Sequence, residues 1–242
     1  MQNSLSELQA KKIVNEASAS DKSDKQVVSK QRVTDHGEVY THEREVNAML
    51  DLVKQETERI ESKFLEPACG TGNFLAEILS RKLTVVKSRY AKSQLEYERY
   101  AVIAISSIYG IDILEDNVEA CQLRLFEIFN KQYIALYKMS IKQPCLDSVL
   151  YILKHNILHG DALTLKTVGD ENTQPKPIVF SEWSAVNGSL IKRRDFVYAH
   201  LVDRASHREM PLFSDLDEEA YIPEPIQDYP LTHFLELNLH GD

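Results

Sequence analysis

The segment from Phe64 to Leu75 has the residue types of a ligand-binding turn. It reads FLEPACGTGNFL: a short apolar run, a stretch of small residues that includes Gly70 and Gly72, and then a helix-forming run. Glycines let the backbone approach a ligand closely, and the N–H groups at a helix start attract anionic or zwitterionic groups. The pattern indicates a site for such a ligand, although a GxG turn by itself is also compatible with a simple tight turn.

Two classes of nucleotide-binding turn do not fit this segment. The third glycine of a dinucleotide-binding fingerprint is replaced by Leu75, which argues against NAD or FAD. No Lys-Ser or Lys-Thr pair directly follows either glycine, so the segment is not a P-loop.

Two acids follow later apolar runs. Asp112 comes directly after the run at 108–111, and an acid at that place in a doubly wound sheet usually accepts hydrogen bonds from ribose hydroxyls. The alternatives are a solvated loop acid or a cap of the helix that starts near Asp116. Asp161 follows the next run, where an acid could meet the exocyclic amino group of a purine. Three strand ends that converge on one crevice are a stronger signal than any one of them.

The elements that position these residues alternate along the chain. Short apolar runs predict strands at 64–66, 108–111, 156–159 and 177–180, with helical stretches around 73–106 and 116–139. This alternation is typical of an α/β fold with a largely parallel sheet. The stretch at 73–106 is long enough for one protruding helix or for two helices.

A further helix is predicted before the first strand, because four apolar residues recur at the spacing of one helix face. They are Val46, Met49, Leu50 and Val53, and Thr41 is the expected N-cap.

Composition divides the chain into three parts. Residues 1–35 are polar and predicted to form a mobile arm, and residues 36–208 form the main domain. Residues 209–242 are an acidic, proline-rich tail, expected to run over a surface in extended form and to end in a short strand at 233–239. The tail holds nine acids and no Lys or Arg, which leaves 28 acids and 28 bases before it. DNA binding must therefore come from a local cluster or from a partner.

Other features of the 242 residues bound the class of protein. No apolar run approaches the roughly 18 residues of a membrane helix, and no signal peptide is evident. The three cysteines are widely spaced, which fits a reduced cytoplasm and predicts neither a disulfide framework nor a zinc site. We therefore expect a cytoplasmic protein without a membrane segment or a metal.

The string Glu66–Phe74 resembles the first motif of the adenine-N6 DNA methyltransferases that serve as modification subunits of restriction-modification systems. In that family the motif surrounds the methionine part of S-adenosylmethionine. Asp112 with Ile113 resembles the family's ribose-binding motif, and Asp161 with Ala162 its adenine-contacting motif. The segment 37–41 resembles the N-terminal motif that closes over the methionine end, except that the usual proline is His42 here.

The resemblance covers roughly residues 33–165. It implies a Rossmann-like S-adenosylmethionine-dependent methyltransferase fold, with a mostly parallel sheet and helices on both faces, here incomplete. It also implies a set of cofactor-binding residues: Tyr40, Thr41, Glu66, Pro67, Ala68, Gly70, Thr71, Gly72, Asn73, Phe74, Asp112, Ile113, Asp161 and Ala162.

The family's catalytic loop is the main departure. These enzymes carry an Asn/Asp/Ser-Pro-Pro-aromatic loop after the fourth strand, in which the polar side chain accepts from the target amino group and the aromatic ring stacks on the flipped base. Here the strand leads into Ser181-Glu182-Trp183-Ser184, and the chain contains no Pro-Pro pair. Ser181 and Trp183 are weak catalytic candidates. The alternative, which we favour, is a Trp183 packed in the core or at a subunit contact.

One basic cluster offers a weak nucleic-acid candidate. Lys192, Arg193 and Arg194 precede Phe196 and Tyr198, so bases and aromatic rings interleave. More often such a run is the solvated face of a strand or helix.

Two functions follow as hypotheses. The first is a DNA adenine-N6 methyltransferase-like subunit of a restriction-modification or phage-defence system, which reaches DNA through a partner that supplies target recognition, a catalytic loop or both. The second is a subunit that keeps the cofactor site but has lost methyl transfer and acts only with a partner chain. Methylation of RNA, protein or a small molecule fits the first motif less well.

Overall fold

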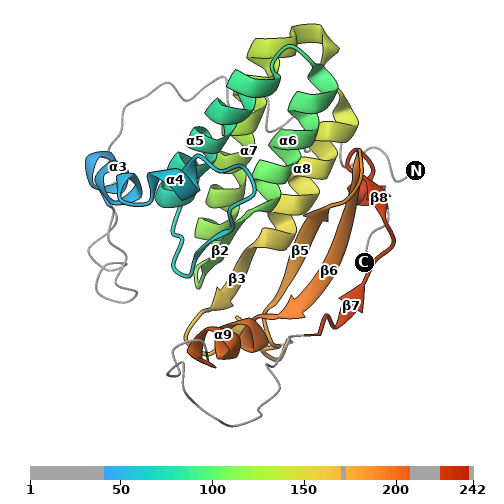
Figure 1. Cartoon of the computed structure of the whole chain (residues 1–242). Helices are drawn as coiled ribbons and strands as arrows, with labels where there is room; N and C mark the ends of the chain where they lie inside the picture. Colours follow the sequence, from blue (N-terminus) through green and yellow to red (C-terminus); the bar gives the residue numbers. More distant parts are fainter. Residues whose placement is uncertain (1–40, 170–172, 208–223, 240–242) are drawn as a thin grey trace, which may run out of the picture. The chain divides into compact units, whose positions relative to one another are not determined.

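The computed structural model describes residues 41–169, 173–207 and 224–239 (Figure 1). The predicted arm at 1–35 and much of the predicted tail lie outside these ranges. The α-helices are α3 (Glu43–Asp51), α4 (Lys54–Thr57), α5 (Asn73–Tyr90), α6 (Gln94–Ser106), α7 (Glu115–Tyr137), α8 (Gln143–Asn156) and α9 (Tyr198–His207). The strands are β1 (Phe64–Glu66), β2 (Ile108–Asp112), β3 (Ile157–Asp161), β4 (Lys166–Thr167), β5 (Val179–Ala185), β6 (Leu190–Val197), β7 (Gln227–Asp228) and β8 (Thr232–His233). Two short 3-10 helices are η1 (Lys138–Ser140) and η2 (Leu237–Leu239).

The first three predicted strands form a parallel sheet, as expected. Strand β2 lies between β1 and β3, and β4 continues the sheet in the antiparallel direction. Each crossover between parallel strands is helical, which is how parallel neighbours are normally joined. Because β1, β2 and β3 run the same way, their carboxyl ends lie at one edge.

The fourth predicted strand corrects the expectation of a mostly parallel sheet. Strand β5 pairs with β6 in the antiparallel direction and belongs to a second sheet, in which β7 and β8 also pair with β6. The turn between β5 and β6 contains Asn187 and Gly188, with Gly188 at φ 66°. Asn-Gly between two strands is a strong hairpin signal, and it would have identified this pairing.

The helices agree with the predicted ranges in part. The stretch 73–106 is two helices, because the chain leaves α5 after Tyr90 and Ser93 caps α6 by accepting from the Glu96 N–H. Helix α7 matches the predicted stretch at 116–139. Helix α8 was not predicted, although Pro144 in its first turn is a typical helix start.

Two apolar clusters cover the two faces of the parallel sheet, one formed with helices and the other with strand β5. Helices α5 to α8 lie side by side in Figure 1, and their buried faces form one cluster with Ile108 and Ile157. Tyr109 and Ile111 of β2 pack on the other face, in a cluster with Phe180 of β5. The resemblance implies helices on both faces, whereas an antiparallel strand provides part of the cover on this second face.

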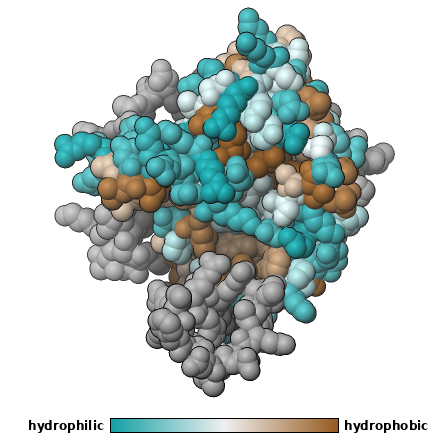
Figure 2. All heavy atoms as spheres, viewed as in Figure 1, coloured by the Kyte–Doolittle hydropathy of each residue, from teal (hydrophilic) through white to brown (hydrophobic). Residues whose placement is uncertain are grey.

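The apolar face of α3 is narrower than its sequence pattern predicts. Val46 and Leu50 are buried, but Met49 and Val53 are exposed, and the neighbouring Leu52 is 86% exposed. In Figure 2, viewed as in Figure 1, hydrophobic side chains are visible at the position of α3. Helix α3 is therefore attached by few apolar contacts.

The predicted strand at 233–239 is mostly a different structure. Only Thr232–His233 is a strand, and the 3-10 helix η2 follows it. Phe234 is fully buried against the helix cluster, so this end of the chain contributes to the core.

Lys82 of α5 is a buried cation at the amino-terminal ends of β1 and β2. It is 0% exposed, and its Nζ donates to the carbonyl of Ile60 at 3.1 Å, to the Ser107 hydroxyl at 2.6 Å and to the carbonyl of Ser62. Burial lowers the pKa of Lys82 to about 7, and the nearby acids Glu61 and Glu56 oppose this shift. The side chain joins the segment before β1 to the helix layer.

The Lys82 ammonium should make stability rise with pH above neutrality. Below about pH 7 both the folded and the unfolded chain hold the proton, and the burial penalty is present in full. Between about pH 7 and the ordinary lysine pKa of 10.5 the unfolded chain binds more protons than the folded one, so the free energy of unfolding increases with pH, by about 1.4 kcal/mol per unit at most. Urea denaturation of wild type and Lys82→Met at several pH values measures this. Parallel pH curves for the two proteins would contradict it.

Candidate functional site

The carboxyl ends of β1, β2 and β3 bring three acids to one edge of the sheet. Glu66 ends β1 and pairs in register with Gly110, while Asp112 ends β2 opposite His159 of β3, two residues before Asp161. Parallel alignment of adjacent strands thus gathers the acids that the sequence spreads over 96 positions.

The turn between β1 and α5 has the backbone of a ligand-binding loop. Gly70 and Gly72 have φ values of 52° and 83°, in the left-handed region that glycine adopts without strain. Gly72 is the N-cap of α5, no side chain caps this end, and the first turn of α5 contains no acid. The positive end of an 18-residue helix therefore lacks a negative partner among the capping groups.

Asp112 holds this turn in place. Its Oδ2 accepts from the Gly70 N–H at 2.8 Å, and its Oδ1 accepts from the Leu114 N–H at 2.9 Å and from Asn117 Nδ2 at 3.1 Å. The Cys69 N–H also donates to the Ile111 carbonyl at 2.9 Å. Asp112 is 8% exposed, so one buried carboxylate joins the glycine turn to the start of α7. Of the two roles that the sequence allows for Asp112, a helix cap is not seen: α7 has Leu114 as its N-cap and no side-chain capping bond, and Asp112 bonds the N–H of that residue and the side-chain amide of Asn117 instead.

Close packing behind the turn requires glycine at two positions. A Cβ atom on Gly72 would lie 2.6 Å from Cys121 Sγ, and one on Gly110 would lie 3.0 Å from Cys69 Sγ. The thiol of Cys69 has its pKa raised, first by a hydrogen bond with Cys121 and second by burial. Cys69 is thus a protonated packing residue and not an activated nucleophile.

The residues from Glu66 to Phe74 differ in their exposure to solvent. Burial raises the pKa of Glu66, and a hydrogen bond from the Ala68 backbone opposes the shift. Pro67 and Ala68 are exposed, while Phe74 packs against the helix cluster.

Asp161 is half-buried and has local partners. Its Oδ1 accepts from the Leu163 N–H at 2.8 Å and its Oδ2 from the Thr164 hydroxyl at 3.0 Å. These bonds, the Leu163 one first, lower the pKa of Asp161, which keeps it ionised. Ala162 follows, and Leu163 is 95% exposed. The sequence analysis did not include Leu163 among the site residues. Its position two residues after Asp161 is the sequence feature that could have indicated it.

A second exposed apolar side chain lies at the end of β2. Ile113 is 47% exposed, and its carbonyl is 3.0 Å from His159 Nε2, which links the ends of β2 and β3.

The start of α5 contacts residues from two other elements. Arg124 of α7 donates to Asn73 Oδ1 at 2.5 Å and to the Thr71 carbonyl at 3.5 Å. Asn73 Nδ2 in turn donates to the Thr41 carbonyl at 3.5 Å. Arg124 was missed by the sequence analysis, because nothing local distinguishes it from other exposed helix arginines.

Thr41 lies beside the glycine turn but is not the N-cap of α3. The N-cap is His42, whose Nδ1 accepts from the Arg44 N–H at 3.2 Å. Tyr40, the other predicted residue of this motif, lies outside the described residues.

One comparison with known proteins identifies the family. Residues 40–174 match the model of the family described as MmeI, DNA-methyltransferase domain. The chain belongs to this family. No curated protein and no solved structure matches it.

The methyltransferase-domain match contains the glycine turn and the acids at 66, 112 and 161, and it ends before β5. Within the described ranges, no helix has the length and apolar character needed to cross a membrane. Nor does this part of the chain contain a group of three or more His, Cys, Asp or Glu side chains suited to a metal ion.

The two weak catalytic candidates lie after the matched segment, in buried contacts of their own. The Ser181 hydroxyl donates to Asp195 at 2.7 Å and accepts from Arg193 Nε at 3.1 Å. Trp183 is 6% exposed and its Nε1 donates to Asn156 Oδ1 at 2.9 Å. The structure therefore does not bring either side chain to the strand ends with the methyltransferase motifs. Trp183 has the core position that we favoured.

The basic cluster is paired with acids of its own chain. Each of its three cations has an acid partner: Lys192 with Asp228, Arg193 with Asp195, and Arg194 with Glu182. Arg193 is also buried, at 7% exposure. These pairs neutralise the cluster that was a weak nucleic-acid candidate.

Proposed function

We propose that this chain binds S-adenosylmethionine and forms the cofactor-binding part of a DNA adenine-N6 methyltransferase in a restriction-modification or phage-defence system. The observation that carries the proposal is the glycine turn of a DNA-methyltransferase domain, held by a buried Asp112 at the edge where three parallel strands end.

The donor set at this edge suits the chemistry of the cofactor. The uncapped start of α5 favours a carboxylate, and the Glu66 carboxylate favours the ammonium and sulfonium charges. Asp161 is the acid open to the nucleoside, whereas Asp112 is buried, already accepts three hydrogen bonds and shapes the ribose end by holding Gly70 and Leu114. The exposed side chains of Ile113 and Leu163 offer apolar contact for the ring. When bound, S-adenosylmethionine supplies an activated methyl group.

Calorimetry on the full chain tests cofactor binding. We expect S-adenosylmethionine and S-adenosylhomocysteine to bind and NAD not to bind, because Leu75 replaces the third glycine of a dinucleotide turn. If neither S-adenosylmethionine nor S-adenosylhomocysteine binds at millimolar concentration, the proposal is overturned.

In this proposal the chain takes part in methyl transfer only together with a partner chain. The chain contains no Pro-Pro-aromatic loop, and Ser181 and Trp183 are committed to internal contacts. We expect transfer of a radiolabelled methyl group to unmodified DNA only when proteins encoded beside this one are added. A partner would supply the acceptors and the stacking ring for the flipped adenine.

The second candidate is a subunit that binds the cofactor without methylating. The burial of Ser181 and Trp183 favours it. Binding of S-adenosylmethionine with no methyl transfer in any combination of partners would establish this candidate in place of the first.

A further inference from the structure

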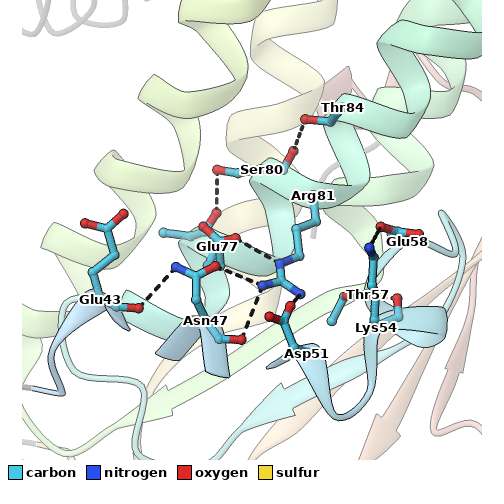
Figure 3. A network of polar contacts seen from close by, with 11 residues as sticks. Glu43, Asn47, Asp51, Lys54, Thr57, Glu58, Glu77, Ser80, Arg81 and Thr84 are labelled. Atoms are coloured by element: carbon cyan, nitrogen blue, oxygen red, sulfur yellow. Dashed lines mark hydrogen bonds and ion pairs between the residues drawn. The ribbon is translucent and has the colours of Figure 1, made fainter. Parts of the chain in front are cut away.

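Arg81 of α5 makes a dense set of polar contacts with α3 (Figure 3). Its Nη1 lies 2.8 Å from Asp51 Oδ1, and its Nη2 donates to Asn47 Oδ1 at 2.9 Å and to the Asn47 carbonyl at 3.4 Å. Its Nε donates to Glu77, one turn earlier on α5, at 2.8 Å. The Arg81 side chain is only 14% exposed. All three guanidinium nitrogens are therefore used, two of them on α3.

This contact matters because α3 has little else to hold it. Its buried apolar residues are Val46 and Leu50, while Met49 is 56% exposed. A planar guanidinium can bond to several acceptors in fixed directions, which a single ammonium cannot do. Arg81 is thus the main polar attachment between α3 and α5 among the contacts described here.

The attachment lies two turns from the glycine turn. Helix α5 begins at Asn73, whose Nδ2 donates to the carbonyl of Thr41, and Thr41 directly precedes the N-cap of α3. Asn73 directly follows Gly72, the last glycine of the turn. The place of α3 along α5 therefore sets the place of Thr41 beside the turn.

We propose that Arg81 is a positioning residue for the cofactor, which docks α3 on α5 and so keeps Thr41 against the turn that binds the amino-acid end of the ligand. This inference rests on the proposed function. Arg81 itself does not contact the ligand. It lowers the conformational freedom of Thr41 next to the start of α5, and preorganisation of that kind increases affinity.

The test compares two ligands that differ only at the amino-acid end. S-adenosylhomocysteine has this end, and 5′-methylthioadenosine has the same nucleoside without it. Arg81→Met should weaken S-adenosylhomocysteine about tenfold, within the usual range of coupling between sites, and change methylthioadenosine binding less than twofold. Arg81→Lys should restore little, because one ammonium cannot span Asp51, Asn47 and Glu77.

Arg99 provides the matched control. It pairs with Glu96 at 3.6 Å on α6, away from α3, and its side chain is 23% exposed. Arg99→Met should leave both ligand affinities unchanged. If Arg81→Met does not fold, Asp51→Asn removes the same ion pair from the α3 side and leaves the bond to Glu77 in place.

Each outcome decides the inference. Selective loss of S-adenosylhomocysteine affinity supports it. Equal loss of both ligands, or unchanged binding in Arg81→Met and Asp51→Asn, overturns it. A wild-type chain that binds neither ligand contradicts the proposed function itself, so the two failures are distinguishable.

Discussion

A Gly72→Ala protein is expected to be less stable than wild type by about 2–5 kcal/mol and to lose cofactor affinity. Two costs add at this position. A non-glycine residue at φ 83° carries about 1–2 kcal/mol of backbone strain. Its Cβ would also lie 2.6 Å from Cys121 Sγ, and overpacking of that kind costs about 1–3 kcal/mol. Urea denaturation measures the sum.

Gly188 separates the two costs. It also has a positive φ, 66°, but a Cβ there would have nothing within 4 Å. Gly188→Ala should therefore show the strain alone. The contribution of Cys121 is measured with a double-mutant cycle, in which Cys121→Ala should make Gly72→Ala less damaging. A Gly72→Ala protein no less stable than Gly188→Ala would show that the packing behind the turn is not limiting.

Asp112→Ala is expected to cost about 3 kcal/mol of stability and to remove binding of both S-adenosylhomocysteine and methylthioadenosine. The substitution leaves three donors without their acceptor in a buried site: the N–H groups of Gly70 and Leu114 and the amide of Asn117. A buried unsatisfied group costs about 1–3 kcal/mol, and water entering the gap recovers part of the total. Thermal and urea denaturation measure the first effect and calorimetry the second.

Asp161→Ala is the matched control for Asp112→Ala. Asp161 also ends a parallel strand and accepts two hydrogen bonds, but it is less buried than Asp112, so water can replace its contacts with Leu163 and Thr164. We expect weaker nucleoside binding with little change in stability. If Asp161→Ala destabilises the protein as much as Asp112→Ala does, burial does not explain the cost at Asp112.

The Gly72 and Asp112 variants should also affect different ends of the ligand. Gly72 lies at the start of α5, where the amino-acid end is proposed to bind, whereas Asp112 ends the strand assigned to the ribose. Loss at Gly72 should be larger for S-adenosylhomocysteine than for methylthioadenosine, and loss at Asp112 should be similar for both. The same pair of ligands that tests Arg81 therefore maps the whole site.

The sequence by itself determined the strands β1 to β3, the glycine turn and the family. These features are local: apolar runs, turn residues and helix-forming stretches act over a few positions, and parallel pairing then follows from the helical crossovers. The prediction of Thr41 as an N-cap was wrong by one residue. Threonine is a common N-cap, but the ring nitrogen of His42 also accepts from a free N–H of the first turn, and here His42 is the cap.

Only the tertiary structure decided which side chains act on the turn. Asp112 and Gly70 are 42 positions apart, and Arg81 and Asn47 are 34 apart, so no periodicity connects them. The same holds for the second sheet. The apolar run predicted a strand at 177–180, of which only Val179 and Phe180 lie in β5, and the partner of β5 depended on the hairpin at Gly188 and on the packing of Phe180 against Tyr109. Contacts between distant residues form when helices and strands bury their apolar faces together, and this burial is a property of the whole fold.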